Sequence, residues 1–500
     1  MYAYIMLLFL LSLLLLCIRR LRGWFYLIRG PEMIDEAYVS AGGMPFKVPT
    51  PNNNHLMVTS SYHIKELINA PLQSLSLHAV AKEILQPKYT MSGFEWQDQR
   101  GIEGTGFVRA LRSRLTAHLP GMLPDLKRMV EAAITEELGT PDTDGMLTIK
   151  PGSVHCRLFP LIKRAVTKVN CFVFFGEQLA QNPEFTAAAL EFPQTVIFAS
   201  EILRITPSFL RHSVASLVTE RHRAVKTLMR YLEPVVKQRL AMRAVDSTEN
   251  VDCMQWLIET SPRKTQWTTA RMVGEIIAVW FGSVHQLAMT ATYAIEDLCS
   301  HEEYVRPLRE EVYGVAPEGL CPDLAAMPLL DSFLRETIRC TNSDAITARR
   351  KALTPFTFSD GLRVDRGDWV CIPQRAMMRD PARYSHAEQF DGFRFARANK
   401  LLALNEGCAD VPEVAPLQLT DVDVNWPIWG LGNTACPGRF YATTVLKLMM
   451  VCILQGWECR LADPQALRWR TWRSSVVPRT GTVVVFERRQ MESPTLVRRG

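Results

Sequence analysis

The sequence predicts a mainly α-helical fold with small β-sheets, preceded by one N-terminal transmembrane helix. Three observations lead to this expectation. Helical periodicity runs through several long stretches, short alternating segments cluster between residues 346 and 373, and the first 18 residues are uncharged and apolar. With 500 residues and 47% hydrophobic content, the chain is long enough to bury a large core.

The N-terminus reads MYAYIMLLFLLSLLLLCI without a charge, and Arg19, Arg20 and Arg22 follow it. A helix rising about 1.5 Å per residue covers roughly 27 Å over this run, close to the bilayer core of about 30 Å. A cleaved signal peptide is the alternative, but it would carry its basic residues before the apolar run. Residues 1–22 are therefore predicted to be a single-pass anchor in the endoplasmic reticulum membrane. The arginines would keep the catalytic part on the cytosolic side.

Residues 23–55 are rich in proline and glycine and are predicted to form a loop-like linker that leads into one domain, residues 56–500. Helices are expected at 108–138, with interruptions near Pro120 and Pro124, and at 158–182, 213–243, 268–300 and 327–340. Short strands joined by a turn at Asp360-Gly361 are expected between 346 and 373, and a second hairpin in SSVVPRTGTVVVFERR near the C-terminus.

Charge and cysteine content narrow the function classes. A formal net charge of +6 is small for this length, so nucleic acid is not an expected partner. The twelve cysteines show no CxxC pair and no zinc-like spacing. A cytosolic chain keeps its thiols reduced, so no disulfide framework is expected and eleven cysteines read as small buried hydrophobic residues.

The twelfth cysteine, Cys436, stands in the stretch WGLGNTACPGRFYA, residues 429–442. Gly430 and Gly432 permit backbone angles and close approaches that side chains would prevent. The long apolar segment after Gly438 is predicted to be a helix, whose N-terminus would stabilise a thiolate. A thiolate in a bare glycine loop suits an iron ligand, although an ordinary loop cysteine before a core helix would show the same local pattern.

The stretch resembles the haem-binding loop FGxGxxxCxG of the cytochrome P-450 superfamily, with Trp429 in the place of the phenylalanine. Further landmarks follow the family order. Glu336 and Arg339 in DSFLRETIRC resemble the ExxR pair, and Arg394 in FDGFRF resembles the arginine that completes that network. Alone, a Glu-Arg pair on a helix is a weak signal. The resemblance covers residues 25 to 490 and implies the cytochrome P-450 fold.

The resemblance implies haem b, with Cys436 as the axial ligand of the iron and Trp429, Gly430, Gly432 and Gly438 shaping the loop. Such enzymes activate O2 and insert one oxygen atom into an unreactive bond of a lipophilic substrate. The electrons would come from NADPH-cytochrome P-450 reductase. Glu336, Arg339 and Arg394 would form a buried charged network that fixes the loop, and buried charges must be paired.

The stretch 271–304 corresponds to the helix that crosses over the haem in the family. Its usual signature is AGx[D/E]T, in which the acid and the threonine relay protons. Here Gly282 leaves room for the haem, His285 replaces the acid and Gln286 replaces the threonine. Histidine can relay protons near neutral pH and glutamine can donate a hydrogen bond, but both side chains could instead only pack between helices.

Haem propionates need cationic partners. The stretch TARRKAL offers Arg349 and Arg350, of which strand alternation allows one to face the haem; counting back from the turn favours Arg350. Arg112 is the nearest match for a second partner, and Thr434 stands where the loop often has Arg or His. Arg439 and Lys447 are expected on the face where an acidic reductase would dock.

The C-terminal half resembles fungal members of the family, many of which oxidise terpenoid, polyketide or alkaloid intermediates of secondary metabolism. Two alternatives stay open. A haem-thiolate isomerase or dehydratase needs no external electrons and can dispense with the distal threonine. A non-catalytic haem-containing binding protein would bind ligands without turnover. The sequence therefore predicts a membrane-bound haem-thiolate monooxygenase and leaves its substrate open.

Overall fold

The computed structural model describes residues 2–93, 106–139, 147–150, 152–242, 251–262, 267–315, 321–403 and 418–489. It is mainly helical with small sheets, as predicted. The helices are α1 (Tyr2–Ala41), α2 (Ser61–Asn69), α3 (Leu77–Leu85), α4 (Pro87–Thr90), α5 (Gly106–Arg109), α6 (Thr116–Gly139), α7 (Leu158–Phe175), α8 (Glu177–Ala180), α9 (Pro183–Ile205), α10 (Arg211–Val218), α11 (Arg223–Met242), α12 (Cys253–Thr260), α13 (Thr269–Ser300), α14 (Val305–Val315), α15 (Pro328–Cys340), α16 (Gln374–Met378), α17 (Arg394–Ala403) and α18 (Arg439–Gly456).

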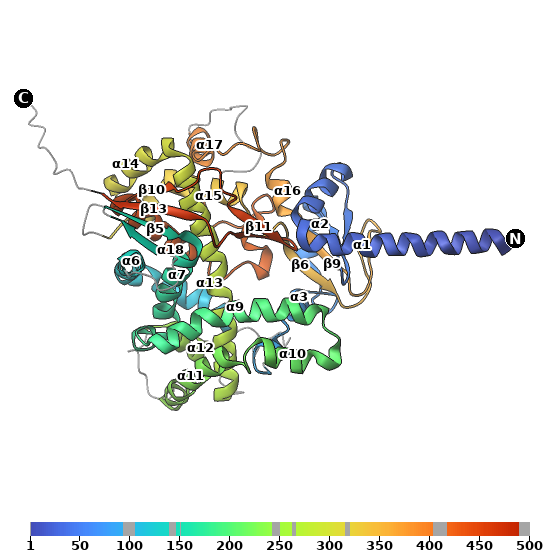
Figure 1. Ribbon diagram of the computed structural model, residues 1–500, viewed down its shortest axis with the longest axis horizontal. Coiled ribbons are helices and arrows are strands. Elements are labelled where there is room, and N and C mark those ends of the chain that lie inside the picture. The colour runs from blue at the N-terminus through green and yellow to red at the C-terminus, as the bar shows by residue number, and fades with distance from the viewer. Residues whose placement is uncertain are drawn as a thin grey trace, which may run out of the picture.

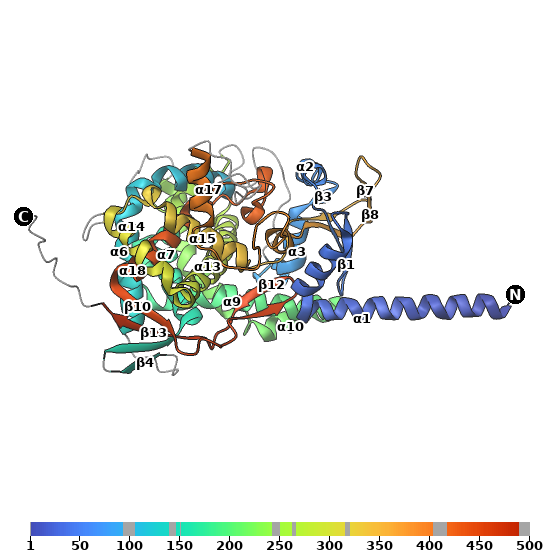
Figure 2. The ribbon, with the colours of Figure 1, turned by 90° about the horizontal axis from the view of Figure 1, so that it is seen from above.

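The strands are β1 (Phe46–Pro49), β2 (Asn54–Met57), β3 (Leu75–Ser76), β4 (Leu147–Lys150), β5 (Ser153–Arg157), β6 (Thr347–Ala352), β7 (Phe356–Thr357), β8 (Arg363–Val364), β9 (Trp369–Ile372), β10 (Trp457–Leu461), β11 (Trp469–Trp472), β12 (Ser475–Pro478) and β13 (Val483–Arg488). They form sheets ordered β1-β2-β9-β6-β3, β10-β13-β5-β4, β11-β12 and β7-β8. Figures 1 and 2 show the five-stranded sheet at the end of the molecule that α1 enters, and the larger helical part around α13 at the other end.

The prediction of a linker over residues 23–55 is wrong, because α1 continues to Ala41 and β1 and β2 follow it. Pro31 lies inside this helix, next to a break at Arg29. Proline lacks an N–H, so the carbonyl of Leu27 loses its helical partner. The backbone N–H of Arg473 takes that carbonyl at 2.8 Å. A tertiary contact therefore lets the segment stay helical where its composition suggests a loop.

The predicted N-terminal anchor concerns residues 1–22, and the side chains of residues 1–21 lie outside the described part of the chain. The anchor therefore stays a prediction. Among the residues that the structure describes, one helix is long and apolar enough to cross a membrane, namely α13, and 67% of its most apolar window is buried inside the protein. The apolar character of α13 thus reflects its place in the core.

Two of the expected helices are each divided into two. The stretch 158–182 breaks at Gly176, whose φ of +80° is left-handed, to give α7 and α8. The stretch 213–243 breaks where Glu220, Arg221 and His222 all adopt positive φ, between α10 and α11. The expected interruptions at Pro120 and Pro124 are absent, because α6 runs through both prolines and is preceded by a π-helix over Ala110–Leu115.

The hairpin predicted at Asp360-Gly361 is present, since β7 and β8 pair in antiparallel fashion around it. The second predicted hairpin is wrong. Its two halves form β12 and β13 as strands, but β12 pairs with β11, whereas β13 pairs with β10 and β5. The alternating pattern identifies the strands, and distant segments supply their partners.

The core is built around α13, which packs against α7, α11, α15 and α18. One hydrogen bond shows how the helices are held. Pro193 lacks the N–H that would reach the carbonyl of Ala189 within α9. The indole N–H of Trp280 in α13 donates to that carbonyl at 2.9 Å. This bond joins α9 to the centre of α13.

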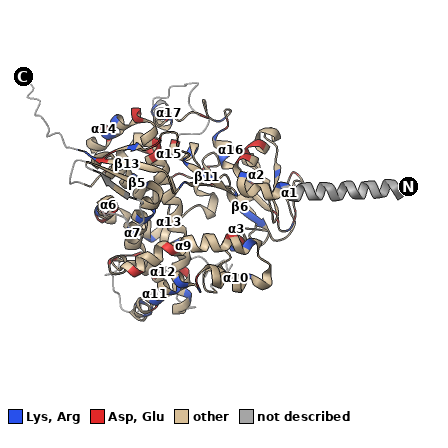
Figure 3. Ribbon diagram, in the orientation of Figure 1, with Lys and Arg blue, Asp and Glu red and all other residues tan. Residues whose placement is uncertain are grey.

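The cysteines that the structure describes are unpaired. Most are buried or half-buried, but Cys321 is exposed, so it does not fit the expectation of a buried residue. Figure 3 shows Lys and Arg segments interspersed with Asp and Glu segments across the described ribbon. The positive net charge is therefore distributed along the chain.

Candidate haem-thiolate site

Cys436 lies in the loop before α18, as the sequence predicts. Gly430 and Gly432 have φ values of +73° and +60°, a left-handed conformation that favours glycine. The backbone N–H of Cys436 donates to the carbonyl of Trp429 at 2.7 Å. The indole N–H of Trp429 donates to the carbonyl of Leu419 at 2.6 Å. Gly438 caps α18, and a Cβ added to it would meet nothing within 4 Å.

The protein environment of the thiol has two opposing effects. Burial raises the pKa of Cys436 above its ordinary value, whereas the backbone N–H of Gly438 and the guanidinium of Arg439 act to lower it. Burial dominates, so the helix start alone does not produce the thiolate that the sequence suggests. A metal cation at the sulfur would supply the missing stabilisation, because coordination deprotonates a thiol.

Glu336, Arg339 and Arg394 meet in one buried network. Glu336 and Arg339 are 0% exposed and Arg394 is 5% exposed. Arg339 donates two hydrogen bonds to the Glu336 carboxylate, both of 2.8 Å, and Arg394 Nε lies 3.3 Å from both carboxylate oxygens. Burial opposes the charge of Arg339, but the bonds to Glu336 outweigh it and raise the pKa of the guanidinium.

The arginines also hold the chain between α16 and α17. Arg339 donates to the carbonyls of Met378, Ala387 and Gln389, and Arg394 donates to that of Ser385. The network therefore ties α15 to the segment that leads toward the cysteine loop.

Arg335, next to Glu336, is a further member of this network that no sequence pattern indicated. Its guanidinium lies 3.9 Å from the ring centre of Phe395 and 5.1 Å from that of Trp426. These cation–π contacts extend the network to the loop that carries Trp429.

The helix α13, which the family resemblance places over the haem, has one open face. Gly282 and Gln286 are exposed, although most of α13 around them is buried. They are four residues apart and so lie on the same face of the helix. A Cβ added to Gly282 would meet nothing within 4 Å. The structure therefore leaves open space at the two positions where the family resemblance places the haem and oxygen.

His285 lies beside this face and is turned toward α9, where it bonds the backbone of Pro193. Its Nε2 atom is buried and has no hydrogen-bond partner among the described residues. Burial first, and then the charge of Lys163, lower the pKa of His285 to about 4. The imidazole is therefore neutral near pH 7 and is not positioned with Gln286.

This buried imidazole predicts acid destabilisation. Its folded pKa of about 4 lies below the unfolded value of about 6.5, so the unfolded chain binds more protons between these values and stability falls as the pH drops through this window. At pH 5 the expected loss is about 2 kcal/mol. Urea unfolding at pH 7 and pH 5 should show this difference in the wild type and a smaller one in His285→Asn.

Other buried histidines, such as His55, whose pKa is also lowered by burial, are common to both proteins and cancel in this comparison. Equal pH dependence of the two proteins would show that folding does not lower the pKa of His285.

Arg350 reaches the cysteine loop and Arg349 does not. Arg350 is 2% exposed and its Nη2 donates to Thr434 Oγ1 at 2.7 Å. Arg349 instead pairs with Asp344. The pairing of β6 with β9 is irregular between Thr347 and Arg350, and Ala348 within this irregularity has a φ of +48°. The geometry thus selects the arginine that the sequence favours, while a propionate contact stays a prediction.

Arg112 approaches the same loop from the π-helix, with Nη2 3.4 Å from the carbonyl of Asn433. Two guanidinium groups therefore contact the neighbouring loop residues 433 and 434. This arrangement fits two carboxylates at the edge of a haem.

The predicted basic face formed by Arg439 and Lys447 is wrong. Lys447 is 6% exposed and pairs with Asp331 at 2.8 Å, because its place on α18 faces α15. Arg439 is half-buried and donates to the carbonyls of Thr420 and Cys436. Arg439 therefore supports the loop, and Lys447 is part of the core.

A polar connection that sequence reasoning missed joins the two sides of the site. Tyr441 of α18 donates to Asn170 at 2.7 Å, and Asn170 of α7 donates to the carbonyl of Ser283 in α13 at 2.8 Å. Asn170 is 0% exposed. The signal for this connection in the sequence is Asn170, a polar residue within the apolar stretch of α7. The bonds fix the distance between the cysteine-bearing side and the distal helix.

Together these residues fit a thiolate-bound haem. The site contains the half-buried Cys436, the open face of α13 at Gly282 and two arginines at the cysteine loop. The elements of these residues pack together, since α13 contacts α18, the helix after the loop. The described residues contain no group of three or more His, Cys, Asp or Glu side chains that could hold a metal ion alone. A single-cysteine iron site is consistent with a macrocycle that supplies the other ligands.

Comparison with known proteins shows the family of the chain. The sequence profile of the cytochrome P450 family matches residues 108–482. Cytochrome P450 monooxygenase 151 of Postia placenta is 27% identical over 89% of this chain and 86% of its own length. Cytochrome P450 monooxygenase olcJ of Penicillium canescens is 27% identical over 89% and 81%, and the ent-kaurene oxidase of Gibberella intermedia is 27% identical over 71% and 65%.

Among solved structures, retinoic acid bound cyanobacterial CYP120A1 matches with a TM-score of 0.67 and 18% identity, over 91% of this chain and 94% of that one. At this identity the match demonstrates the shared fold.

Proposed function

Since the chain belongs to the cytochrome P450 family, we propose that this monooxygenase oxidises a lipophilic intermediate of fungal secondary metabolism with electrons derived from NADPH. A thiolate-ligated haem iron, when bound, supplies the activation of O2. The substrate would be a terpenoid, a polyketide or an alkaloid. Three relatives named above are fungal proteins, and one of them is named as an oxidase of ent-kaurene, which supports this substrate range.

The observation that carries the proposal is the position of Cys436 in a glycine loop before α18, a helix that packs against α13, which bears the open face. Cys436 would hold the haem iron through its sulfur, with Trp429 and the loop glycines shaping its surroundings. Arg350 and Arg112 would hold the two propionates. Glu336, Arg339 and Arg394 keep the loop in place.

Gln286 shares the open face with Gly282, so we expect its amide to hold ordered water on the face of α13 that a haem would meet. His285 bonds α9 and is neutral near pH 7, and we assign it to positioning of α13. Proton delivery therefore depends on ordered water and Gln286 in place of the acid and threonine of the family signature.

The proposal includes a membrane anchor over residues 1–22 in the endoplasmic reticulum, with the catalytic domain in the cytosol. The apolar run and the following arginines support it. NADPH-cytochrome P-450 reductase is the proposed electron donor. Because Lys447 is buried, the face of this protein that docks the reductase must use basic residues other than Arg439 and Lys447.

The test is turnover by the purified protein in vesicles with that reductase. We expect NADPH oxidation that requires reductase, O2 and a lipophilic substrate, and transfer of ¹⁸O from labelled O2 into product. Candidate substrates can first be screened by shifts in the ferric absorption spectrum. An isomerase or dehydratase would form product without NADPH, and a binding protein would show spectral shifts without product; either result would contradict the proposal.

A further inference from the structure

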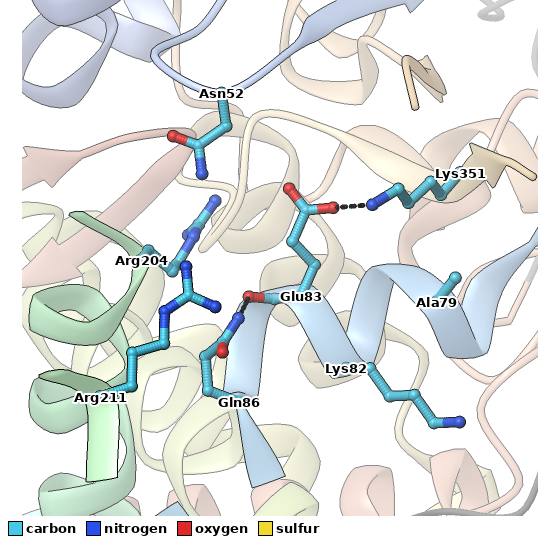
Figure 4. Close-up of a pocket in the computed structure, with 8 residues that line it drawn as sticks. All are labelled: Asn52, Ala79, Lys82, Glu83, Gln86, Arg204, Arg211 and Lys351. Atoms are coloured by element: carbon cyan, nitrogen blue, oxygen red, sulfur yellow. Dashed lines mark hydrogen bonds and ion pairs between the residues drawn. The ribbon is translucent and has the colours of Figure 1, made fainter. Parts of the chain in front are cut away.

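A cavity of about 450 Å³ lies where α3, the end of α9, the start of α10 and strand β6 meet. Figure 4 shows the side chains around it, from elements that are far apart in the sequence. Its lining residues are Asn52, Ala79, Lys82, Glu83, Gln86, Arg204, Arg211 and Lys351.

The lining is strongly cationic. Four of its residues carry positive charge, and Glu83 is its single acidic residue. Lys351 pairs with Glu83 at 2.7 Å, so that carboxylate is already engaged. Arg204 and Arg211 add to the positive charge of the lining, which therefore carries more positive than negative side chains. Like charges gathered in a cavity repel each other unless an anion joins them.

Arg204 is the most constrained of these cations. Its side chain is only 7% exposed, and its Nε is buried without a hydrogen-bond partner among the described residues. Its carboxylate partner, Glu201, at 2.9 Å, is shared with Arg473 at 2.6 Å. Burial and the charge of Arg473 lower the pKa of Arg204. One carboxylate therefore serves two buried guanidinium groups.

Arg211 completes the arrangement from α10. Its Nε donates to the carbonyl of Thr206 at 3.0 Å, which fixes the side chain. Figure 4 shows the terminal nitrogens of Arg204 and Arg211 directed into the same hollow, with the amide of Asn52 at its rim. Two planar guanidinium forks facing one space match the oxygens of a carboxylate or phosphate.

We propose that this cavity binds an oxyanion, the carboxylate or phosphate group of a small molecule, through Arg204 and Arg211. Asn52 and Lys82 stand at its edge, and Lys351 keeps Glu83 from filling the site.

The site is one strand away from the cysteine loop. Arg350 and Lys351 are neighbours in β6 and point to opposite faces, the first to Thr434 and the second to Glu83 at the cavity. The oxyanion has two possible sources, the acidic end of a lipophilic substrate or a free anion. The first source rests on the proposed function, whereas the binding site itself does not.

The experiment uses the haem-loaded full-length protein and isothermal titration calorimetry with three probes: decanoate, decan-1-ol and inorganic phosphate. We expect an anionic probe to bind the wild type and to bind at least tenfold more weakly to Arg211→Ala, since a charge-assisted hydrogen bond is lost. The Arg204→Gln variant should bind the anionic probe with a similar loss of affinity. Arg128→Ala, which changes an exposed arginine of α6 that pairs with Asp125, is the matched control and should bind as the wild type does.

Binding of decanoate without competition by phosphate, with a ferric spectral shift, would identify an acidic substrate. Binding of phosphate alone, without a spectral shift, would identify a free anion. Either result supports the site if Arg211→Ala and Arg204→Gln both weaken binding of the anion. Arg211→Ala is the decisive variant if Arg204→Gln does not fold. The proposal is overturned if neither anion binds the wild type, or if Arg211→Ala binds as the wild type does. The carbon monoxide spectrum of the same samples reports separately on the haem-thiolate site.

Discussion

Replacing Cys436 with alanine is expected to abolish the red-shifted Soret band of the reduced, carbon-monoxide-bound protein and to reduce turnover below detection. Alanine keeps the loop geometry, because the backbone N–H of residue 436 can still donate to Trp429. It removes the sulfur, and no other cysteine lies in the loop between Gly430 and Gly438. A thiolate is needed for this spectral signature and for favouring O–O cleavage.

Cys452→Ala is the matched control, because Cys452 is a half-buried thiol on α18, the helix that follows the loop of Cys436. Its loss should cost about 1 kcal/mol of stability as a small cavity and leave the band in place. Near-ultraviolet circular dichroism would confirm that both variants are folded. A red-shifted band that persists in Cys436→Ala would rule out this cysteine as the iron ligand.

The cysteine loop and the charged network could be predicted because their signals are local. Gly430 and Gly432 need left-handed angles, and the spacing of Glu336 and Arg339 places both on one face of a helix. The resemblance then placed Arg394 with them. Likewise, the spacing of Gly282 and Gln286 puts them on one face of α13 whatever surrounds the helix.

The remaining features depend on contacts that local patterns do not record. Pro31 reads as a loop residue until Arg473, more than 400 positions away, binds the freed carbonyl of Leu27. The break between α10 and α11 contains neither Gly nor Pro, so its left-handed residues gave no signal. Lys447 reads as a surface charge, and its burial is made possible by Asp331 of α15 and the carbonyl of Leu324.

The largest effect on stability is expected at Glu336. Glu336→Ala leaves Arg339 and Arg394 buried without their shared carboxylate, and breaking a buried ion pair in this way costs about 3–5 kcal/mol. This is a large part of the roughly 5–15 kcal/mol that holds a protein folded. We expect a lower urea midpoint and a loss of most bound haem, measured on protein purified in parallel with the wild type.

Three further substitutions separate this network from general effects of charge. Glu310→Ala removes an exposed carboxylate of α14 that pairs with Arg306 and should change stability by less than about 1 kcal/mol. Arg339→Lys keeps the charge but cannot reach Glu336 and three backbone carbonyls at once, so its loss of stability should approach that of Glu336→Ala.

Arg394→Ala combined with Glu336→Ala should cost less stability than the sum of the two single changes, because the double variant removes one of the stranded charges. Additive losses, or a stable haem-loaded Glu336→Ala, would mean that the network does not hold the loop that presents Cys436.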